Sequence, residues 1–431
     1  MDLHDLHGVP ATVVSMKRLL LLAAAVAAFL SFSAPAEASP YVRYGLQDDA
    51  WLVYGPGTLN ERIAELDRIG VDLVRFTINW NQVEKVRGKR SWGSADAVLE
   101  GLSEHGIAPV VTLYGAPRWA NGGRAPNWAP RSGSTFAAFA AAAANRYPWV
   151  KLWLVWNEPN QRRWLRPTTP QTYVTKLLNP AYAAIHNATP DAKVGGGVTA
   201  PRASTGGVSP VAWIRGMGAA GARLDAYAHN PYPLNPLETP WTGGCGHCET
   251  ITMSTIERLQ REVSRAFGSL TRIWLTEYGY QTSPPDRALG VSKTLQARYL
   301  SEAAYRAFAA RNVDILIQYL YQDEPEIGRW QSGYIAVGGS VKLSYRAAQL
   351  PLVQVSRVGV RTVLWGQVRS GNGRRRYMLQ QFGNGGWRSV GGVGKTTANG
   401  FLSRTVRAGP GATFRLWDPS GEVVSPLIRV S

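Results

Sequence analysis

Two short acidic motifs have the residue types that acid–base chemistry requires. The first, Trp156–Asn160, reads Trp-Asn-Glu-Pro-Asn and follows an apolar run, 150–155, typical of a buried parallel strand. The second, Ile273–Gly279, reads Ile-Trp-Leu-Thr-Glu-Tyr-Gly and repeats this design later in the chain. We therefore predict that Glu158 and Glu277 face each other across one pocket as a pair of carboxyl groups.

Two carboxyl groups in different protonation states can cleave an acetal, because one protonates the leaving oxygen while the other stabilises the developing positive charge. The tryptophan before Glu158 and the negative charge of Glu277 both favour the protonated form of Glu158. Arg75 is the expected positive partner that keeps Glu277 ionised. The alternative interpretation is a buried ion pair that only stabilises the fold.

These groups need a framework that brings them together, and alternating strands and helices provide one. Residues 39–350 contain eight strand–helix units, which is the organisation of an α/β (β/α)8 TIM barrel, and Tyr345 begins the closing helix. In such a barrel catalytic groups lie at the C-terminal ends of strands, where both glutamates fall. A doubly wound sheet would require a Gly-rich phosphate turn after the first strand, and the sequence has none there. The predicted strands are 41–46, 71–78, 107–113, 150–155, 192–198, 224–228, 271–276 and 313–320.

The sequence pattern changes near Pro351. Runs of alternating apolar and polar residues between Gly, Asn and Pro turns predict a small antiparallel β-sandwich over residues 351–431. This segment has 12 Lys or Arg residues against two acidic ones. Its run Arg374–Arg376 is either a patch that binds an acidic cell-surface polymer or a solvated strand end.

Residues 1–38 have the pattern of a Sec-type signal peptide. Lys17 and Arg18 precede the apolar run Leu19–Phe32, and Ala36–Ala38 fits a small-x-small cleavage site. We expect translation to start at Met16 and the mature protein to be secreted, either free or associated with the cell wall. The alternative is a retained membrane anchor, although the apolar run is short for a membrane span.

The net charge is +18, yet no nucleic-acid-binding motif accompanies it, so we do not expect a nucleic-acid partner. The two cysteines, Cys245 and Cys248, predict a local disulfide in an exported protein. A zinc site would need four ligands, and only His247 lies nearby. We therefore expect neither a metal nor an organic cofactor.

The two glutamate motifs, in this order and at these strands, resemble those of the retaining glycoside hydrolases of clan A, with families five and thirty-nine most similar. The resemblance covers residues 41–350 and includes Arg75, Trp80, Trp92 and the run Gly115–Ala120. It implies a retaining β-glycosidase that hydrolyses O-glycosidic bonds of a poly- or oligosaccharide through a glycosyl-enzyme. The alternatives are an inactive carbohydrate- or cell-wall-binding protein and a transglycosylase that uses the same site.

The resemblance also implies roles for residues at matching positions. Glu158 would be the general acid/base and Glu277 the nucleophile, while Asn157 would bind the sugar 2-hydroxyl. His229 and Tyr232 would orient the nucleophile and the sugar. The family spaces this pair as His-x-Tyr, whereas here Asn and Pro separate the two residues, so which of them reaches the nucleophile stays open.

Sugar rings have apolar faces that stack on aromatic side chains, so the tryptophans of strand-following loops are candidate platforms. Tyr321 and Trp330 compete for the platform expected after the eighth strand. The candidate tryptophans are Trp80, Trp119, Trp128, Trp164, Trp241 and Trp330.

Overall fold

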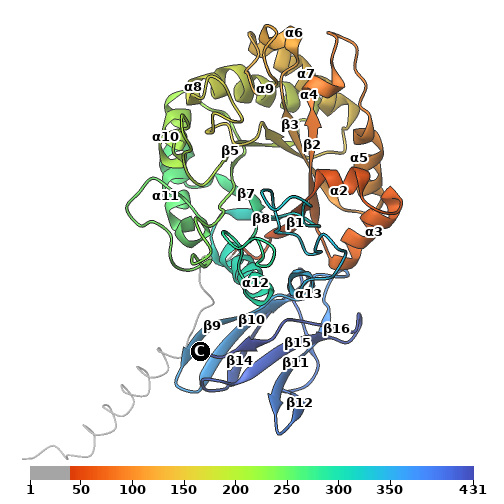
Figure 1. Ribbon diagram of the computed structural model, residues 1–431, viewed down its shortest axis with the longest axis vertical. Coiled ribbons are helices and arrows are strands. Elements are labelled where there is room, and N and C mark those ends of the chain that lie inside the picture. Colours follow the sequence, from red (N-terminus) through yellow and green to blue (C-terminus); the bar gives the residue numbers. More distant parts are fainter. Residues whose placement is uncertain (1–38) are drawn as a thin grey trace, which may run out of the picture. The chain divides into compact units, whose positions relative to one another are not determined.

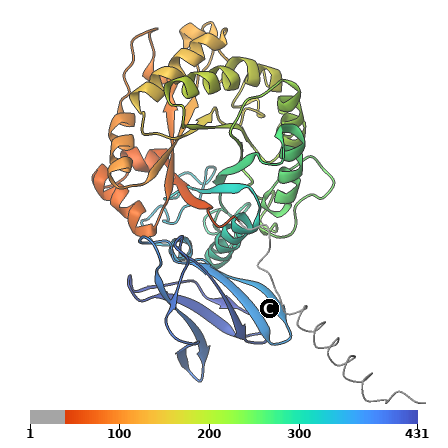
Figure 2. The same cartoon turned by 180° about the vertical axis from the view of Figure 1, so that it is seen from behind.

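The computed structural model describes residues 39–431, and the predicted signal segment 1–38 lies outside them. Eight parallel strands close into a barrel in sequence order (Figures 1 and 2). The predicted (β/α)8 fold is therefore confirmed. The strands are β1 (Arg43–Gln47), β2 (Leu73–Asn79), β3 (Ala108–Tyr114), β4 (Leu152–Val155), β5 (Lys193–Thr199), β6 (Ala226–His229), β7 (Arg272–Tyr278) and β8 (Val313–Tyr319).

Helices surround the barrel, and local sequence signals define their ends. In α3, Thr58 and Glu61 form a capping box, and Gly70 ends the helix in the left-handed conformation at φ 81°. The helices are α2 (Asp49–Tyr54), α3 (Leu59–Ile69), α4 (Trp80–Val83), α5 (Ser94–Glu104), α6 (Arg118–Asn121), α7 (Gly133–Arg146), α8 (Pro170–Tyr173), α9 (Asn179–Ala188), α10 (Pro210–Ala219), α11 (Ile256–Phe267), α12 (Lys293–Ala309) and α13 (Leu343–Gln349). A π-helical turn, Val174–Leu178, joins α8 to α9, and a 3-10 turn, Met253–Thr255, precedes α11.

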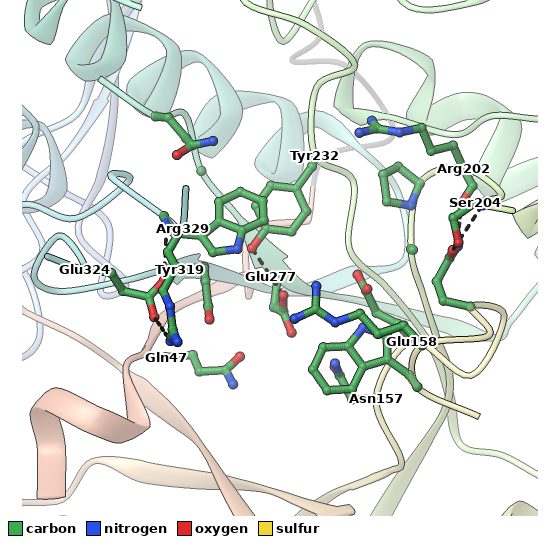
Figure 3. A pocket seen from close by; sticks show the side chains of 18 of the residues that line it. Gln47, Asn157, Glu158, Arg202, Ser204, Tyr232, Glu277, Tyr319, Glu324 and Arg329 are labelled. Carbon is green, nitrogen blue, oxygen red and sulfur yellow. Dashed lines mark hydrogen bonds and ion pairs between the residues drawn. The ribbon is translucent and has the colours of Figure 1, made fainter. Parts of the chain in front are cut away.

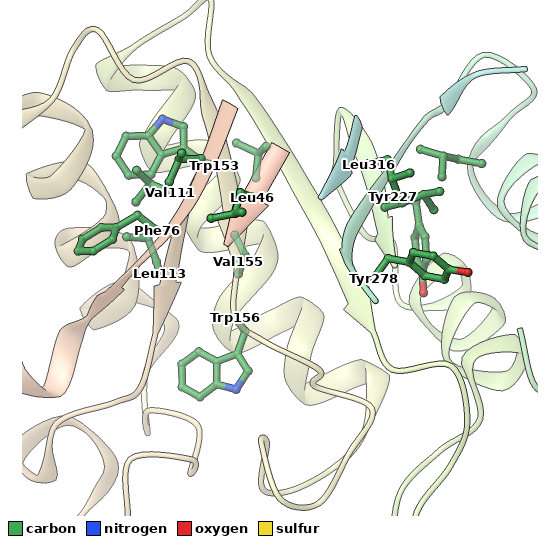
Figure 4. Packing of buried hydrophobic residues seen from close by; sticks show 14 of the residues in the cluster. Leu46, Phe76, Val111, Leu113, Trp153, Val155, Trp156, Tyr227, Tyr278 and Leu316 are labelled. Carbon is green, nitrogen blue, oxygen red and sulfur yellow. The ribbon is translucent and has the colours of Figure 1, made fainter. Parts of the chain in front are cut away.

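Strand side chains alternate between two apolar layers, as the two-residue period of a strand requires. One layer fills the barrel interior and includes Leu73, Leu154 and Trp274. The other lies between strands and helices, and Figure 4 shows Phe76 and Trp153 among its members. This alternation decides which strand residues can reach the mouth of the barrel.

Two antiparallel sheets follow the barrel, as the sequence predicts. The first C-terminal sheet has the order β14–β10–β9, and the second has the order β12–β11–β15–β16, with β13 paired to β11 and β17 to β15. The strands are β9 (Leu352–Val358), β10 (Arg361–Gln367), β11 (Arg376–Gly383), β12 (Gly386–Ser389), β13 (Gly394–Lys395), β14 (Phe401–Arg407), β15 (Thr413–Asp418), β16 (Val423–Val424) and β17 (Ile428–Arg429).

The first C-terminal sheet packs on both of its faces. Leu364 and Leu402 share an apolar core with Phe414 of the second sheet. On the other face Trp365 and Phe401 join the barrel core, and their rings lie 5.3 and 4.8 Å from that of Phe308 in α12. The last barrel helix, α13, leads directly into β9, so the barrel and the first C-terminal sheet share apolar packing near residue 350. Within residues 39–431, no helix is long and apolar enough to cross a membrane.

Candidate active site

A cavity of about 820 Å³ opens at the C-terminal ends of the barrel strands and contains both predicted carboxyl groups. Glu277 reaches it from β7, Glu158 from the segment after β4, and Arg75 from β2. Figure 3 shows Glu158 and Glu277 pointing into the same space, with Tyr232 close to Glu277. The structure therefore brings together the pair that the two motifs predict.

Both carboxylate oxygens of Glu277 accept hydrogen bonds. Arg75 Nη1 donates to Oε1 at 2.6 Å, and the Tyr232 hydroxyl donates to Oε2 at 3.2 Å. Glu277 is 8% exposed and Arg75 only 1%, so this ion pair is buried. This guanidinium is thus in direct contact with Glu277, as expected of the positive partner predicted for that residue.

Arg75 also orients Asn157. Its Nη2 donates to Asn157 Oδ1 at 2.7 Å, and its Nε donates to Thr112 Oγ1 at 2.9 Å. Because Asn157 Oδ1 is occupied by Arg75, the amide Nδ2 is the atom that remains to donate into the cavity. This geometry suits the predicted contact with a sugar hydroxyl.

Glu158 lies in a different electrostatic environment. Burial and the negative charge of Glu277 raise its pKa to about 7, and a hydrogen bond from Asn230 and the charge of Arg75 partly oppose this rise. Near neutral pH a large fraction of Glu158 therefore carries a proton. The two carboxyl groups thus lie in different surroundings, because Glu277 has a guanidinium partner and Glu158 does not.

The backbone around Glu158 is strained. Trp156 and Glu158 both have left-handed φ angles, 70° and 38°, which cost non-glycine residues about 1–3 kcal/mol each. Surrounding bonds hold this conformation, because the Glu158 N–H donates to the Val198 carbonyl at 3.0 Å and Trp156 Nε1 donates to the Trp164 carbonyl at 2.7 Å. In this conformation Glu158 lines the cavity, whereas Trp156 is fully buried.

Tyr232, and not His229, reaches the predicted nucleophile. His229 is fully buried; its Nδ1 lies 2.8 Å from Thr199 Oγ1 and its Nε2 lies 3.0 Å from the Ile251 carbonyl. Burial lowers the pKa of His229 to about 4, so the ring is neutral. The predicted substrate contact of His229 is therefore wrong, and this residue is a hydrogen-bonded core histidine.

Asn230, which was not among the predicted site residues, connects the two glutamate motifs. Its Nδ2 donates to Glu158 Oε1 at 3.1 Å, and its Oδ1 accepts from Thr276 Oγ1 at 2.8 Å. Thr276 precedes Glu277 on β7, so Asn230 links Glu158 to the strand that carries Glu277. The one sequence feature that could have identified this residue is its polar amide between His229 and Pro231, directly after a buried strand.

Of the two candidates after β8, Trp330 lines the cavity and Tyr321 does not. The Trp330 ring lies 4.7 Å from that of Tyr232, which bonds the predicted nucleophile. Tyr321 instead stacks on Trp51 at 3.8 Å and donates its hydroxyl proton to Glu65 Oε1. The predicted platform role of Tyr321 is therefore wrong.

Two further predicted platforms, Trp80 and Trp119, also lie outside the cavity lining. Trp80 is fully buried and donates Nε1 to Glu84 Oε2 at 2.9 Å, while Trp119 donates Nε1 to the Glu84 carbonyl at 2.8 Å. Strand alternation explains the error for Trp80: Arg75, Thr77 and Asn79 face the cavity, so the residue after them turns outward. Among the other candidates Trp164 lines the cavity, whereas Trp128 and Trp241 do not.

A third carboxyl group, Asp49, also lines the cavity. Its Oδ1 accepts from the Thr77 N–H at 3.3 Å. Burial is the main cause of its raised pKa, and the charge of Glu277 adds to it. Sequence reasoning missed this residue, because Asp49 follows the short strand β1 without any motif. Other polar cavity residues that were not predicted include Gln47, Asn79, Arg163, Arg202, Tyr319, Glu324 and Arg329.

A buried ion pair holds the loop that carries Trp330. Lys342 and Asp323 are each 1% exposed at their side chains, and Lys342 Nζ donates to Asp323 Oδ1 at 2.7 Å. The same Nζ donates to Thr282 Oγ1 and to the Gln331 carbonyl, at 2.9 and 3.0 Å. Gln331 is adjacent to Trp330, and Thr282 lies in the segment after β7. Lys342 therefore ties the loop that carries Trp330 to that segment.

Within residues 39–431, no cluster of three or more His, Cys, Asp or Glu side chains could hold a metal ion. Cys245 and Cys248 form a disulfide in the loop between β6 and α11. Neither cysteine lines the cavity.

Comparisons with known proteins agree at the level of the fold. No family model and no curated protein matches the sequence. A family 39 glycoside hydrolase from the gut symbiont Bacteroides cellulosilyticus WH2 matches with a TM-score of 0.60 and 17% identity over 86% of this chain and 82% of that one. The GH39 enzyme from Xanthomonas axonopodis pv. citri matches at 0.55 and 13% identity over 86% and 92% of the chains. A glucosidase from Croceicoccus marinus matches at 0.57 and 11% identity over 87% and 94%. The chain therefore shares the fold of clan A glycoside hydrolases, an eight-stranded parallel barrel followed by antiparallel β-sheets.

Proposed function

We propose that this protein is a retaining β-glycoside hydrolase that acts on a poly- or oligosaccharide. The observation that carries the proposal is the contrast between two carboxyl groups in one cavity. Glu277 is paired with Arg75, whereas burial and a neighbouring charge raise the pKa of Glu158 to about 7. Such a pair supplies the ionised and the protonated group that acetal cleavage needs.

In the first step, a Glu277 carboxylate oxygen attacks the anomeric carbon while Glu158 donates its proton to the glycosidic oxygen. The bond to the leaving sugar breaks, and a glycosyl ester forms on Glu277. Arg75 donates a hydrogen bond to the side-chain oxygen of Asn157, so the side-chain nitrogen Nδ2 is free to donate to the sugar 2-hydroxyl. Tyr232 holds the carboxylate by its second oxygen, which fixes the direction of attack.

The ester then removes the negative charge of Glu277, which is one of the two causes that raise the pKa of Glu158. The pKa of Glu158 falls, so this residue is ionised and acts as the general base. It takes a proton from water while the water oxygen attacks the anomeric carbon, and Glu277 departs as a carboxylate. Two successive displacements leave the anomeric configuration unchanged.

The test is a panel of aryl β-glycosides and oligosaccharides digested by the wild-type protein and two variants. Glu277→Ala should abolish turnover, whereas Glu158→Gln should spare substrates whose leaving groups need no protonation. Wild-type rates for folded Glu277→Ala would contradict the assignment. Sugar binding without hydrolysis across the panel would instead favour a carbohydrate-binding protein, and longer products at high substrate concentration would indicate a transglycosylase.

Export is also a proposal, and the sequence of residues 1–38 supports it. The charged pair before Leu19 and the Ala36–Ala38 site predict a mature chain that begins at Ser39. Mass spectrometry of protein collected from culture medium measures this start directly. Recovery of the chain only in the membrane fraction, with Leu19–Phe32 retained, would contradict it.

A further inference from the structure

The second C-terminal sheet has one packed face and one uncovered face. The first C-terminal sheet lies between it and the barrel, because Trp365 and Leu364 of β10 pack in opposite directions. Residues of β11 and β15 that point toward the first sheet are buried, among them Leu379 and Leu416. The alternate residues of these strands therefore form an outer face on the side away from the barrel.

This outer face carries aromatic residues where an uncovered sheet should be polar. Phe382 of β11 is 48% exposed and pairs in register with Trp387 of β12, and their rings lie 5.3 Å apart. Trp417 of β15 pairs with Met378 on the same face. Exposed apolar groups gathered in this way mark binding surfaces.

Arg415 fixes the aromatic group in place. Its guanidinium carbon lies 4.2 Å from the centre of the Trp387 ring, and its Nε donates to Gln380 Oε1 at 2.7 Å. Register places Arg415 opposite Gln380 on the outer face. The surface thus presents a cation and aromatic rings in one fixed arrangement.

Two further cations face each other on the outer face without a counter-charge. Arg376 of β11 pairs directly with Lys395 of β13, both are exposed, and neither forms an ion pair with a carboxylate among residues 39–431. Like charges directly opposite each other destabilise a sheet, and a bound anion would relieve this repulsion. The neighbouring Arg375 is different, because its guanidinium donates to the carbonyls of Ser370 and Ala398.

We propose that this outer face binds an acidic polysaccharide whose sugars carry carboxylates. The rings of Phe382 and Trp387 stack on sugar faces, and Arg376, Lys395 and Arg415 pair with the uronate groups. Residues 351–431 have 12 basic and two acidic residues, which makes the segment complementary to such a polymer. The site lies outside the catalytic cavity, so it would hold the protein on a polymer whether or not that polymer is cleaved.

Affinity gel electrophoresis of the full mature chain in gels that contain polygalacturonate tests the proposal. The parent protein carries Glu277→Ala so that hydrolysis does not alter the gel, and dextran is the neutral control. Trp387→Ala should weaken retention by about tenfold, which corresponds to about 1.4 kcal/mol. Arg376→Glu should weaken it by about threefold or more at low salt.

Arg388→Glu is the matched control. Arg388 is exposed and adjoins Trp387, but it pairs with Gln381, whose position alternates with the outer-face residues. The polygalacturonate gel should retain Arg388→Glu almost as strongly as the parent protein, although this substitution changes the net charge as much as Arg376→Glu does. Far-UV circular dichroism first establishes that each variant is folded. The proposal is overturned if polygalacturonate does not retain the parent protein, or if Arg376→Glu and Arg388→Glu weaken retention equally. It is also overturned if Trp387→Ala is retained as strongly as the parent. Displacement by a single-stranded oligonucleotide at concentrations where free polygalacturonate has no effect would also overturn it.

Discussion

Replacing the predicted acid, Glu158→Gln, should make the protein more stable at alkaline pH. A carboxyl group whose folded pKa exceeds its unfolded value destabilises the fold once it ionises. For Glu158 the pKa rises from the ordinary 4.5 to about 7, so the penalty is absent below pH 4.5 and grows as the pH rises from 4.5 to 7. Above pH 7 the penalty is complete. Glutamine carries no charge and can still accept the hydrogen bond from Asn230.

The magnitude follows from the size of the shift. Each pKa unit corresponds to about 1.36 kcal/mol, so the full shift amounts to about 3 kcal/mol. The Glu158 side chain is partly open to the cavity, where water screens its charge, and we therefore expect a gain of about 1–3 kcal/mol at pH 8. At pH 4 the wild-type side chain is protonated, and the variant should gain nothing.

Urea unfolding of both proteins at pH 4 and pH 8 measures this difference. The control is Glu104→Gln, an exposed glutamate at the end of α5, which should leave the pH dependence unchanged. A Glu158→Gln protein that is no more stable than wild type at pH 8 would refute the raised pKa. An equal gain at both pH values would also refute it, because only ionisation produces the predicted dependence.

Three further substitutions test other contacts of the site. Arg75→Met should cost about 3–5 kcal/mol in urea unfolding at neutral pH and abolish turnover, because Glu277 would be left buried without its partner; turnover near the wild-type level would contradict this role. Tyr232→Phe should lower kcat by about tenfold or more while the unfolding free energy falls by only about 1 kcal/mol, and a loss confined to stability would contradict its contact with Glu277. Lys342→Met should cost about 3–5 kcal/mol in urea unfolding, and the double variant with Asp323→Leu should recover most of this loss; a double variant that is less stable than the single one would contradict the ion pair.

The sequence alone predicted the barrel and the positions of its two glutamates, and the physical reasons are local. Glu158 and Glu277 each stand at the end of an apolar strand, and parallel strands of a closed barrel bring their C-terminal ends to one mouth. The ends of α3 also have local causes, because Thr58 has the side chain and Gly70 the backbone freedom that helix ends need.

The remaining site residues depend on contacts that a linear pattern does not contain. Trp80 was wrongly predicted to contact substrate. Residues 75, 77 and 79 face the cavity, so the alternation of side chains along β2 already places residue 80 on the opposite side. His229 and Tyr232 are close in sequence, and only the path of the loop decides which one reaches Glu277. Lys342 and Asp323 are 19 residues apart in sequence, and only the folded path of the loop after β8 brings their side chains into contact.

The most direct test of the central claim is rescue by azide, with product configuration read by NMR on an aryl β-glycoside that the wild-type protein hydrolyses. In Glu277→Ala, azide should enter the space of the missing carboxylate and give the α-glycosyl azide by a single displacement. In Glu158→Ala, azide should attack the glycosyl ester on Glu277 and give the β-glycosyl azide. The same configuration from both variants, or the reverse assignment, would contradict the roles of the two glutamates.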